Sequence, residues 1–108
     1  MKTPIPAVIE SYFRASNADD IDALVNCFSP DATVADEKQT HRGTAEIKAW
    51  TISVRQKYEF KAEVLGAKET SGLTIVTAKV AGNFPGSPVT LDHKFALRKD
   101  TIASLEIG

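Results

Sequence analysis

Residues 11–34 read SYFRASNADDIDALVNCFSPDATV, and the pattern of apolar residues changes twice along this stretch. Its first part, with Tyr12 and Phe13, continues an apolar series from Ile5 that recurs with the spacing of one helix face. Asn17 then supplies a residue that can end a helix. We therefore predict a first helix that begins near Ile5 and ends near Asn17.

The second part of the stretch predicts a short helix followed by a strand. Asp19 or Asp20 can act as the N-cap of this helix. The apolar residues between positions 21 and 28 form its buried stripe, and Pro30 follows as a stop. The residues from 32 to 36 then have the composition of a strand, so the chain begins with helix, helix and strand.

A loop and a third helix are expected next. The run EKQTHRG, residues 37–43, has the polar composition of a loop that leads into this helix. After Gly43, apolar and hydroxyl side chains recur at helical spacing and would share one face: Ile47, Trp50, Thr51, Val54 and Tyr58.

After Tyr58 the apolar period changes from that of a helix to that of a strand. Phe60, Ala62 and Val64 alternate with charged residues. Turn residues then separate further strand-like runs. These comprise a turn KETSG at 68–72, a strand at 73–83, a break FPGSP at 84–88, an alternating strand at 89–97, a turn at Lys99 and Asp100, and a last strand at 101–107.

This order of elements predicts the α+β class. Helices that are segregated from strands pack together on one face of a mainly antiparallel sheet. A long curved sheet folded over three N-terminal helices makes a cone, and its interior is a natural site for a small molecule. A length of 108 residues suits one domain, which we assign to residues 1–108.

Composition excludes several classes of function. The formal net charge of -1 and the scattered basic residues give no electrostatic basis for binding nucleic acid or an anionic membrane surface. No apolar run is long enough to span a bilayer, and the N-terminus lacks the features of a signal peptide. Cys27 is the only cysteine, so no internal disulfide can form. We therefore expect a cytoplasmic protein.

Two stretches carry a family resemblance: SYFRASNADDIDALVNCFSPDATV, residues 11–34, and HRGTAEIKAW, residues 41–50. With them the chain resembles the nuclear-transport-factor-2-like superfamily, the cone fold of ketosteroid isomerases, scytalone dehydratase and SnoaL-type polyketide cyclases. The likeness covers nearly the whole chain. This fold serves enzymes as well as transport and assembly subunits, so function has to be argued from the site.

The resemblance to ketosteroid isomerases implies three catalytic positions. They are a tyrosine that matches Tyr12, an aspartate base that matches Asp36, and an aspartic acid for which Asp92 is the candidate. Strand alternation favours a different residue at the third position, because it places His93 rather than Asp92 on the apolar face.

Each catalytic candidate also has a purely structural interpretation. If alternation holds along its strand, Asp36 points together with Ala32 and Val34 and is a carboxylate among apolar groups, which suits a general base. Otherwise Asp36 is a solvated residue that hydrogen-bonds its own turn. Tyr12 is either a donor to an enolate oxygen or a core tyrosine. His93 is either a second acid or base or a hydrogen-bonded core histidine.

Large apolar residues on the predicted inner faces are expected to bind the ligand: Phe13, Phe28, Val34, Trp50, Phe60, Val80, Phe84 and Phe95. His41 lies in the predicted loop and is expected to be solvated or a cap. Cys27 has no evident base nearby in the sequence and is expected to be inert packing. The sequence contains no metal-ligand spacing and no nucleotide-binding motif, so we predict neither a metal nor a cofactor.

The sequence leaves two classes of function open. The first is a cofactor-free isomerase, cyclase or dehydratase that transfers protons on a small apolar carbonyl compound, with Asp36 as base, Tyr12 as donor and His93 as second acid or base. The second is a non-catalytic ligand-binding or assembly protein of the same fold. The small and hydroxyl side chains on the polar sheet face predict a homodimer through that face, which the resemblance also implies.

Overall fold

The computed structural model describes residues 5–36 and 38–108. Along these residues the elements follow in this order: α1 (Ala7–Asn17), α2 (Ile21–Val25), β1 (Phe28–Asp36), β2 (Gln39–Arg42), α3 (Gly43–Lys57), β3 (Phe60–Thr70), β4 (Leu73–Gly82), β5 (Val89–Arg98) and β6 (Thr101–Ile107). In the described part of the chain, no helix is long and apolar enough to cross a membrane.

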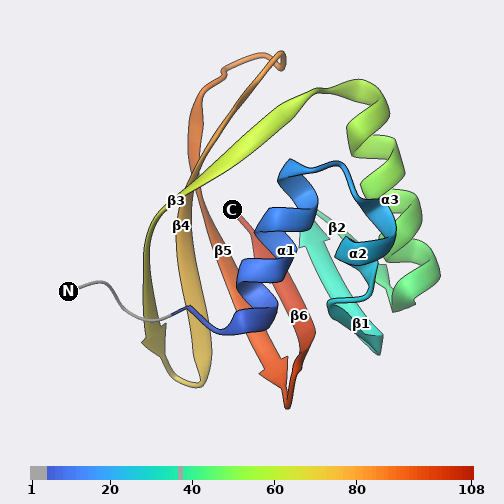
Figure 1. Cartoon of the computed structure of the whole chain (residues 1–108), viewed down its shortest axis with the longest axis vertical. Helices are drawn as coiled ribbons and strands as arrows, with labels where there is room; N and C mark the ends of the chain where they lie inside the picture. The colour runs from blue at the N-terminus through green and yellow to red at the C-terminus, as the bar shows by residue number, and fades with distance from the viewer. Residues whose placement is uncertain (1–4, 37) are drawn as a thin grey trace.

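The strands form one curved, unclosed sheet in the order β2-β1-β6-β5-β4-β3. β1 and β6 run parallel, whereas the other neighbouring strands are antiparallel. The helices lie against one face of this sheet, and β3, in yellow-green, arches from the end of α3 past α1 (Figure 1). The predicted α+β cone is therefore confirmed. The assignment of residues 1–108 to a single domain stays a prediction.

The core fills the space between the helices and the sheet. Its largest fully buried side chains include Ile9 from α1, Ile47 from α3, Phe95 from β5 and Leu105 from β6. Ile9 belongs to the apolar series of the first predicted helix, and Ile47 to that of the third. The helical spacing in the sequence therefore identified the buried faces of both long helices.

The boundary between α1 and α2 depends on two aspartates. Asp20 is the N-cap of α2, because its side chain accepts a hydrogen bond from the backbone N–H of Ala23 at 3.1 Å. Asp19 instead has a φ of 57°, in the left-handed region. The chain therefore turns sharply at Asp19, which leaves its side chain available for a contact outside α2.

β1 is longer than predicted. It begins at Phe28 rather than at residue 32, so Phe28 belongs to the strand and not to the helix before it. Pro30 lies inside β1 as an exposed residue, and the prediction that it stops a helix is wrong. A proline is tolerated there because the pairing of β1 with β6 is interrupted between Phe28 and Thr33, and β2 pairs with β1 only from Thr33 onward.

The loop predicted at 37–43 is wrong in its second half. Gln39–Arg42 form β2, which is antiparallel to β1 and places His41 opposite Val34. Glu37 lies outside the described residues. β2 is an edge strand, and edge strands carry exposed polar side chains that resemble a loop in the sequence.

β3 also extends further than predicted, and the turn predicted at 68–72 shortens to Ser71 and Gly72. These two residues have positive φ angles of 51° and 79°, as a tight two-residue hairpin requires. Nearer its start, β3 has a register shift between Val64 and Gly66 that leaves Leu65 without a partner on β4. Such a bulge bends its strand, so the arch of β3 has a local cause.

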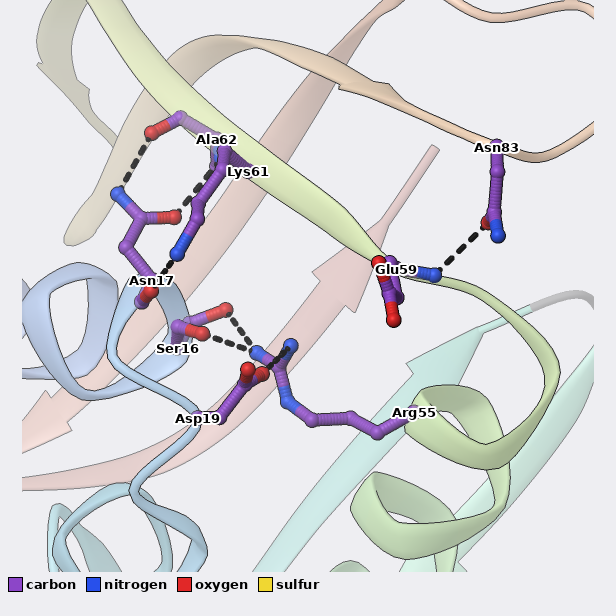
Figure 2. Close-up of polar contacts among 8 residues, drawn as sticks. All are labelled: Ser16, Asn17, Asp19, Arg55, Glu59, Lys61, Ala62 and Asn83. Atoms are coloured by element: carbon purple, nitrogen blue, oxygen red, sulfur yellow. Dashed lines mark hydrogen bonds and ion pairs between the residues drawn. The ribbon is translucent and has the colours of Figure 1, made fainter.

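Side-chain hydrogen bonds hold β3 in place (Figure 2). The amide of Asn17 donates to the carbonyl of Ala62 at 2.9 Å and accepts from the N–H of Ala62 at 2.8 Å. Lys61 donates to the carbonyl of Asn17. The N–H of Glu59 donates to the side chain of Asn83 at 2.8 Å. The end of α1, the start of β3 and the segment after β4 are thereby joined.

Close approach of two backbones requires a glycine at position 82. A Cβ added to Gly82 would lie 2.0 Å from the carbonyl oxygen of Glu59 and 2.7 Å from Cα of Phe60. Since backbone would have to move, Gly82→Ala should lower the free energy of unfolding, measured by urea denaturation, by about 3 kcal/mol. Gly66→Ala is the matched control, because nothing lies within 4 Å of its added Cβ. Equal stability of the two variants would contradict this prediction.

Candidate functional site

A cavity of about 420 Å³ lies between the helices and the inner face of the sheet. This volume falls within the range of small-molecule binding sites. Its walls come from the three helices, the ends of β1 and β6, the inner faces of β3, β4 and β5, and the segment after β4. Aromatic rings supply much of the surface: Tyr12, Phe13, Trp50, Tyr58, Phe60 and Phe84.

Asp36 stands at the end of β1 and lines this cavity. Ala32 and Val34 precede it on the same face and are fully buried, so the predicted common direction of the three side chains is confirmed. The indole N–H of Trp50 donates to Oδ2 of Asp36 at 3.1 Å. The carboxylate is therefore held from α3 through one of its two oxygens.

Tyr12 reaches the same cavity from α1. Its ring makes edge-to-face contacts with Phe13, Phe28 and Phe95 at centroid distances of 5.1, 6.0 and 5.5 Å. Burial raises the pKa of Tyr12 far above its usual value, and the negative charge of Asp36 acts in the same direction. The phenol therefore stays protonated at neutral pH and can donate a hydrogen bond.

His93 lines the cavity from β5 and is 5% exposed. Its ring lies 5.2 Å from that of Phe13, and its Nδ1 is buried without a hydrogen-bond partner in the described part of the chain. Burial lowers the pKa of His93, although hydrogen bonding to the backbone of Leu91 and, to a smaller extent, the charge of Asp36 act in the opposite direction. The imidazole is therefore neutral near pH 7, and an unpaired buried nitrogen is a group whose partner a ligand can supply.

Asp92 points away from the cavity. It is exposed on the outer face of the sheet, where it accepts a hydrogen bond from the hydroxyl of Thr77 at 2.8 Å. Strand alternation therefore chose correctly between Asp92 and His93. Asp92 is therefore not in the position of the third catalytic acid that the resemblance to ketosteroid isomerases implied.

The predicted ligand-binding residues divide into two groups. Those that line the cavity are Phe13, Trp50, Phe60, Val80 and Phe84. Phe28, Val34 and Phe95 lie on inner faces but belong to the buried core rather than to the cavity wall, and their role in ligand binding stays a prediction. The ring of Tyr12, which lines the cavity, packs on both Phe28 and Phe95. Alternation shows on which face of a strand a side chain lies, but not how deep in the cone it lies.

Sequence analysis missed Arg55, which lines the cavity from α3. Its Nη1 lies 2.6 Å from Oδ1 of Asp19, and its Nη2 donates to the hydroxyl of Ser16 at 2.7 Å (Figure 2). A signal was present, since Arg55 follows Ile47 and Thr51 at intervals of four on the buried face of the predicted helix. A charged residue is unusual at such a position unless it is paired.

His41 also differs from its prediction as a solvated loop residue. It is half-buried on β2, and its ring lies 5.9 Å from that of Trp50. Trp50, which holds Asp36, therefore packs against a neighbour on the edge strand. Cys27 is buried, and burial raises the pKa of its thiol, as expected for a residue that serves in packing. Among the described residues there is no cluster of three or more potential metal ligands.

Comparisons with known proteins connect this geometry to a family. The sequence model of the SnoaL-like domain matches residues 9–103. A crystal structure of a candidate polyketide cyclase from Sinorhizobium meliloti is 39% identical, covers 96% of this chain and 95% of its own, and superposes with a TM-score of 0.92. No curated protein matches the sequence.

Two further structures are similar in fold. A protein from Catenulispora acidiphila with a ketosteroid-isomerase-like fold, in complex with trimethylamine, is 19% identical, with coverage of 97% of this chain and 86% of its own and a TM-score of 0.85. A candidate polyketide cyclase from Xanthomonas campestris is 16% identical, with coverage of 93% and 85% and a TM-score of 0.77. At these identities the likeness shows the fold alone.

The neutral state of His93 should make stability depend on pH. Its pKa in the folded chain lies below the ordinary value of 6.5, so the unfolded chain binds this proton more readily. The free energy of unfolding should therefore fall as the pH decreases through about 6.5 toward the lower folded-state pKa. Above about pH 7.5 the histidine is neutral in both states, so His93 should no longer cause any pH dependence. Urea denaturation between about pH 5 and 8 measures it.

The two histidines provide a matched pair of variants for this test. His93→Gln should remove this part of the pH dependence, because the buried titrating group is lost. His41→Gln leaves His93 in place and should retain it. The same pH dependence in His93→Gln as in the unmodified chain would show that another group is responsible.

Proposed function

We propose, from the premise that the chain belongs to the SnoaL-like domain family, that it is a cofactor-free enzyme for proton transfer on a small apolar carbonyl compound. The family and its polyketide-cyclase-like neighbours suggest a small-molecule-binding isomerase or cyclase, and the finer assignment depends on the site. One observation supports this proposal more than any other. A single carboxylate, fixed by an indole, faces an aromatic cavity that also holds a neutral phenol and a neutral imidazole.

Asp36 is the proposed general base. Trp50 bonds to Oδ2, so Oδ1 would take the proton from a carbon next to the substrate carbonyl. The indole contact fixes the direction of the carboxylate, which matters because general-base catalysis requires hydrogen-bond distance to the proton that is removed. Apolar walls strengthen the electrostatic interactions of the carboxylate with a bound substrate.

Tyr12 is the proposed donor to the oxygen on which negative charge develops. As the base takes the proton, electrons move from the breaking C–H bond onto the carbonyl oxygen and form an enolate. A protonated phenol that is already in place stabilises this oxygen without reorganisation of solvent. The phenol is protonated near pH 7, and burial extends this state to higher pH.

His93 is the proposed second group, and its neutral state restricts what it can do. A neutral imidazole can donate a hydrogen bond from one nitrogen and accept one at the other, but it is not a strong acid. It would therefore orient the substrate or accept a proton. If the substrate has a carbon–carbon double bond between its β and γ carbons, the enolate is a dienolate. The protonated Asp36 then returns its proton to the γ carbon, the double bond moves next to the carbonyl group, and the isomerisation is complete without a cofactor.

Asp36→Asn should lower the rate of deuterium exchange at the carbon next to the carbonyl of 1-tetralone by about 10²- to 10⁴-fold, because asparagine cannot accept the proton. NMR in D₂O measures this exchange, with ketone binding followed separately. Asp92→Asn is the matched control, because Asp92 lies on the outer face of the sheet, and it should retain the original rate. Exchange that persists unchanged in Asp36→Asn would assign the activity to another group.

A non-catalytic binding protein is the second candidate function. It is favoured by the outward direction of Asp92, which leaves the cavity without the aspartic acid implied at that position by the resemblance to ketosteroid isomerases. The same experiment separates the two candidates. Binding of the ketone to the unmodified chain without any accelerated exchange would support the binding protein and exclude the proposed reaction.

We also propose that the outer face of the sheet forms a homodimer. The helices leave this face uncovered (Figure 1). Exposed residues of opposite charge pair across its strands, with Glu63 opposite Lys79 and Lys94 opposite Glu106. Such a face has little net charge and alternating signs, so a second copy related by a two-fold axis can match it.

Sedimentation equilibrium at micromolar concentration should therefore give twice the mass of one chain. Thr77→Arg, in the middle of the outer face, should shift the equilibrium toward the monomer because it adds a bulky charge to the interface. Ala7→Arg adds the same side chain at an exposed position on α1 and should leave the dimer intact. A clean monomer for the unmodified chain would exclude this dimer.

A further inference from the structure

Arg55 is a cation in the wall of the cavity, and its charge is neutralised by a residue outside that wall. Its side chain is 12% exposed, whereas the side chain of its partner Asp19 is 69% exposed. Nη1 of Arg55 lies 2.6 Å from Oδ1 of Asp19, and Nη2 donates to the carbonyl and hydroxyl oxygens of Ser16. The guanidinium also lies over the ring of Phe60, 4.8 Å from its centroid. It is therefore held on several sides (Figure 2).

The acidic and basic groups at the cavity do not balance one another in charge. Among the described lining residues, Asp36 is the acidic residue and Arg55 is the basic residue. Arg55 has a carboxylate partner in Asp19, while Asp36 has the neutral indole of Trp50 as its partner. The balance is therefore negative, and it depends on a carboxylate that does not itself line the cavity.

We propose that the Asp19–Arg55 pair is the charge filter of the cavity, with Asp19 as the residue that determines its specificity for uncharged ligands over carboxylates. This inference deepens the proposed function and rests on its premise that the cavity binds a small molecule. A bare guanidinium in an aromatic wall would attract a carboxylate through a strong, bidentate interaction. Asp19 occupies that interaction from the solvent side, so a carboxylate ligand meets the repulsion of Asp36 without compensation.

The position of Arg55 makes its charge relevant inside the cavity. Burial is the main cause of the raised pKa of Tyr12 and Asp36 adds to it, while the positive charge of Arg55 acts in the opposite direction. The field of Arg55 therefore reaches the phenol on the far helix. A change in the neutralisation of Arg55 should be felt by a ligand bound between them.

Asp19→Asn is a suitable variant for geometric reasons. Asp19 has a φ of 57°, and asparagine is among the residues that tolerate the left-handed region best. The amide oxygen of asparagine can still accept the hydrogen bond from Nη1 of Arg55, so the contact is kept and the charge is removed. Asp19→Gly, which also suits a positive φ, is the second variant.

Two probes of nearly the same shape and different charge test the filter at neutral pH. They are 2-acetonaphthone, which is uncharged, and 2-naphthoate, which is a carboxylate. The unmodified chain should bind the ketone more tightly than the carboxylate in equilibrium dialysis. Asp19→Asn should increase the affinity for 2-naphthoate by about tenfold, because the guanidinium is no longer neutralised, and should change that for the ketone by less than about twofold. Asp19→Gly should show the same pattern.

Two controls assign the effect to Arg55. Asp22→Asn removes a carboxylate from an exposed pair with Lys48, at 3.6 Å, and should change neither affinity. The double variant Asp19→Asn with Arg55→Gln should lose the gain for 2-naphthoate, because the cation that caused it is gone. Thermal unfolding of each variant confirms that it is folded.

Several results would overturn the filter. They are equal affinity of the unmodified chain for the two probes, binding of neither probe, an unchanged affinity of folded Asp19→Asn for 2-naphthoate, an equal gain in Asp22→Asn, or loss of folding in both Asp19 variants. Failure of the proposed function would give a different result from failure of the filter, because the ketone would bind without exchanging its protons. Exchange that proceeds while Asp19→Asn fails to admit the carboxylate would reject the filter alone.

Discussion

The position of β3 over the helices depends on a single amide, that of Asn17, which satisfies both backbone groups of Ala62. β3 is an edge strand, so on one side its N–H and C=O groups have no neighbouring strand to bind. Asn17, at the end of α1, takes the place of that strand with two hydrogen bonds. Each contributes on the order of 1 kcal/mol, and loss of the amide would leave two backbone groups unpaired. The arch of β3 therefore stays over the helices, and the space beneath it remains open.

Burial in this space sets the chemistry of its polar groups. The same desolvation raises the pKa of Tyr12 and lowers that of His93, because in each case it disfavours the charged form. Both groups are therefore neutral near pH 7. Asp36 retains a partner in the indole of Trp50, and its carboxylate faces a wall of rings. A donor, an acceptor and a base can thus share one small cavity without forming an ion pair.

Much of the fold and part of the site could be predicted from local pattern. Helical spacing identified the buried faces of α1 and α3, and strand alternation placed His93 inside and Asp92 outside. The predictions that failed concern features without a local pattern. β2 was missed because Gln39–Arg42 are polar and become a strand only by pairing with β1. Phe28 and Phe95 were taken for cavity residues because alternation does not separate the cavity wall from the core behind it.

The sequence by itself determined which residues face inward, because a period of 3.6 or 2 fixes side-chain direction relative to the backbone of its own segment. It thereby determined the α+β class, the cone, and the inward direction of Asp36, Tyr12 and His93. Only the tertiary structure decided which inward residues meet. Asp36 and Trp50 are 14 positions apart, and Arg55 and Asp19 are 36 apart, so their contacts depend on how α3 packs against α1 and β1. Charge balance in the cavity follows from those contacts, since it is a property of distances across the fold rather than of any one segment.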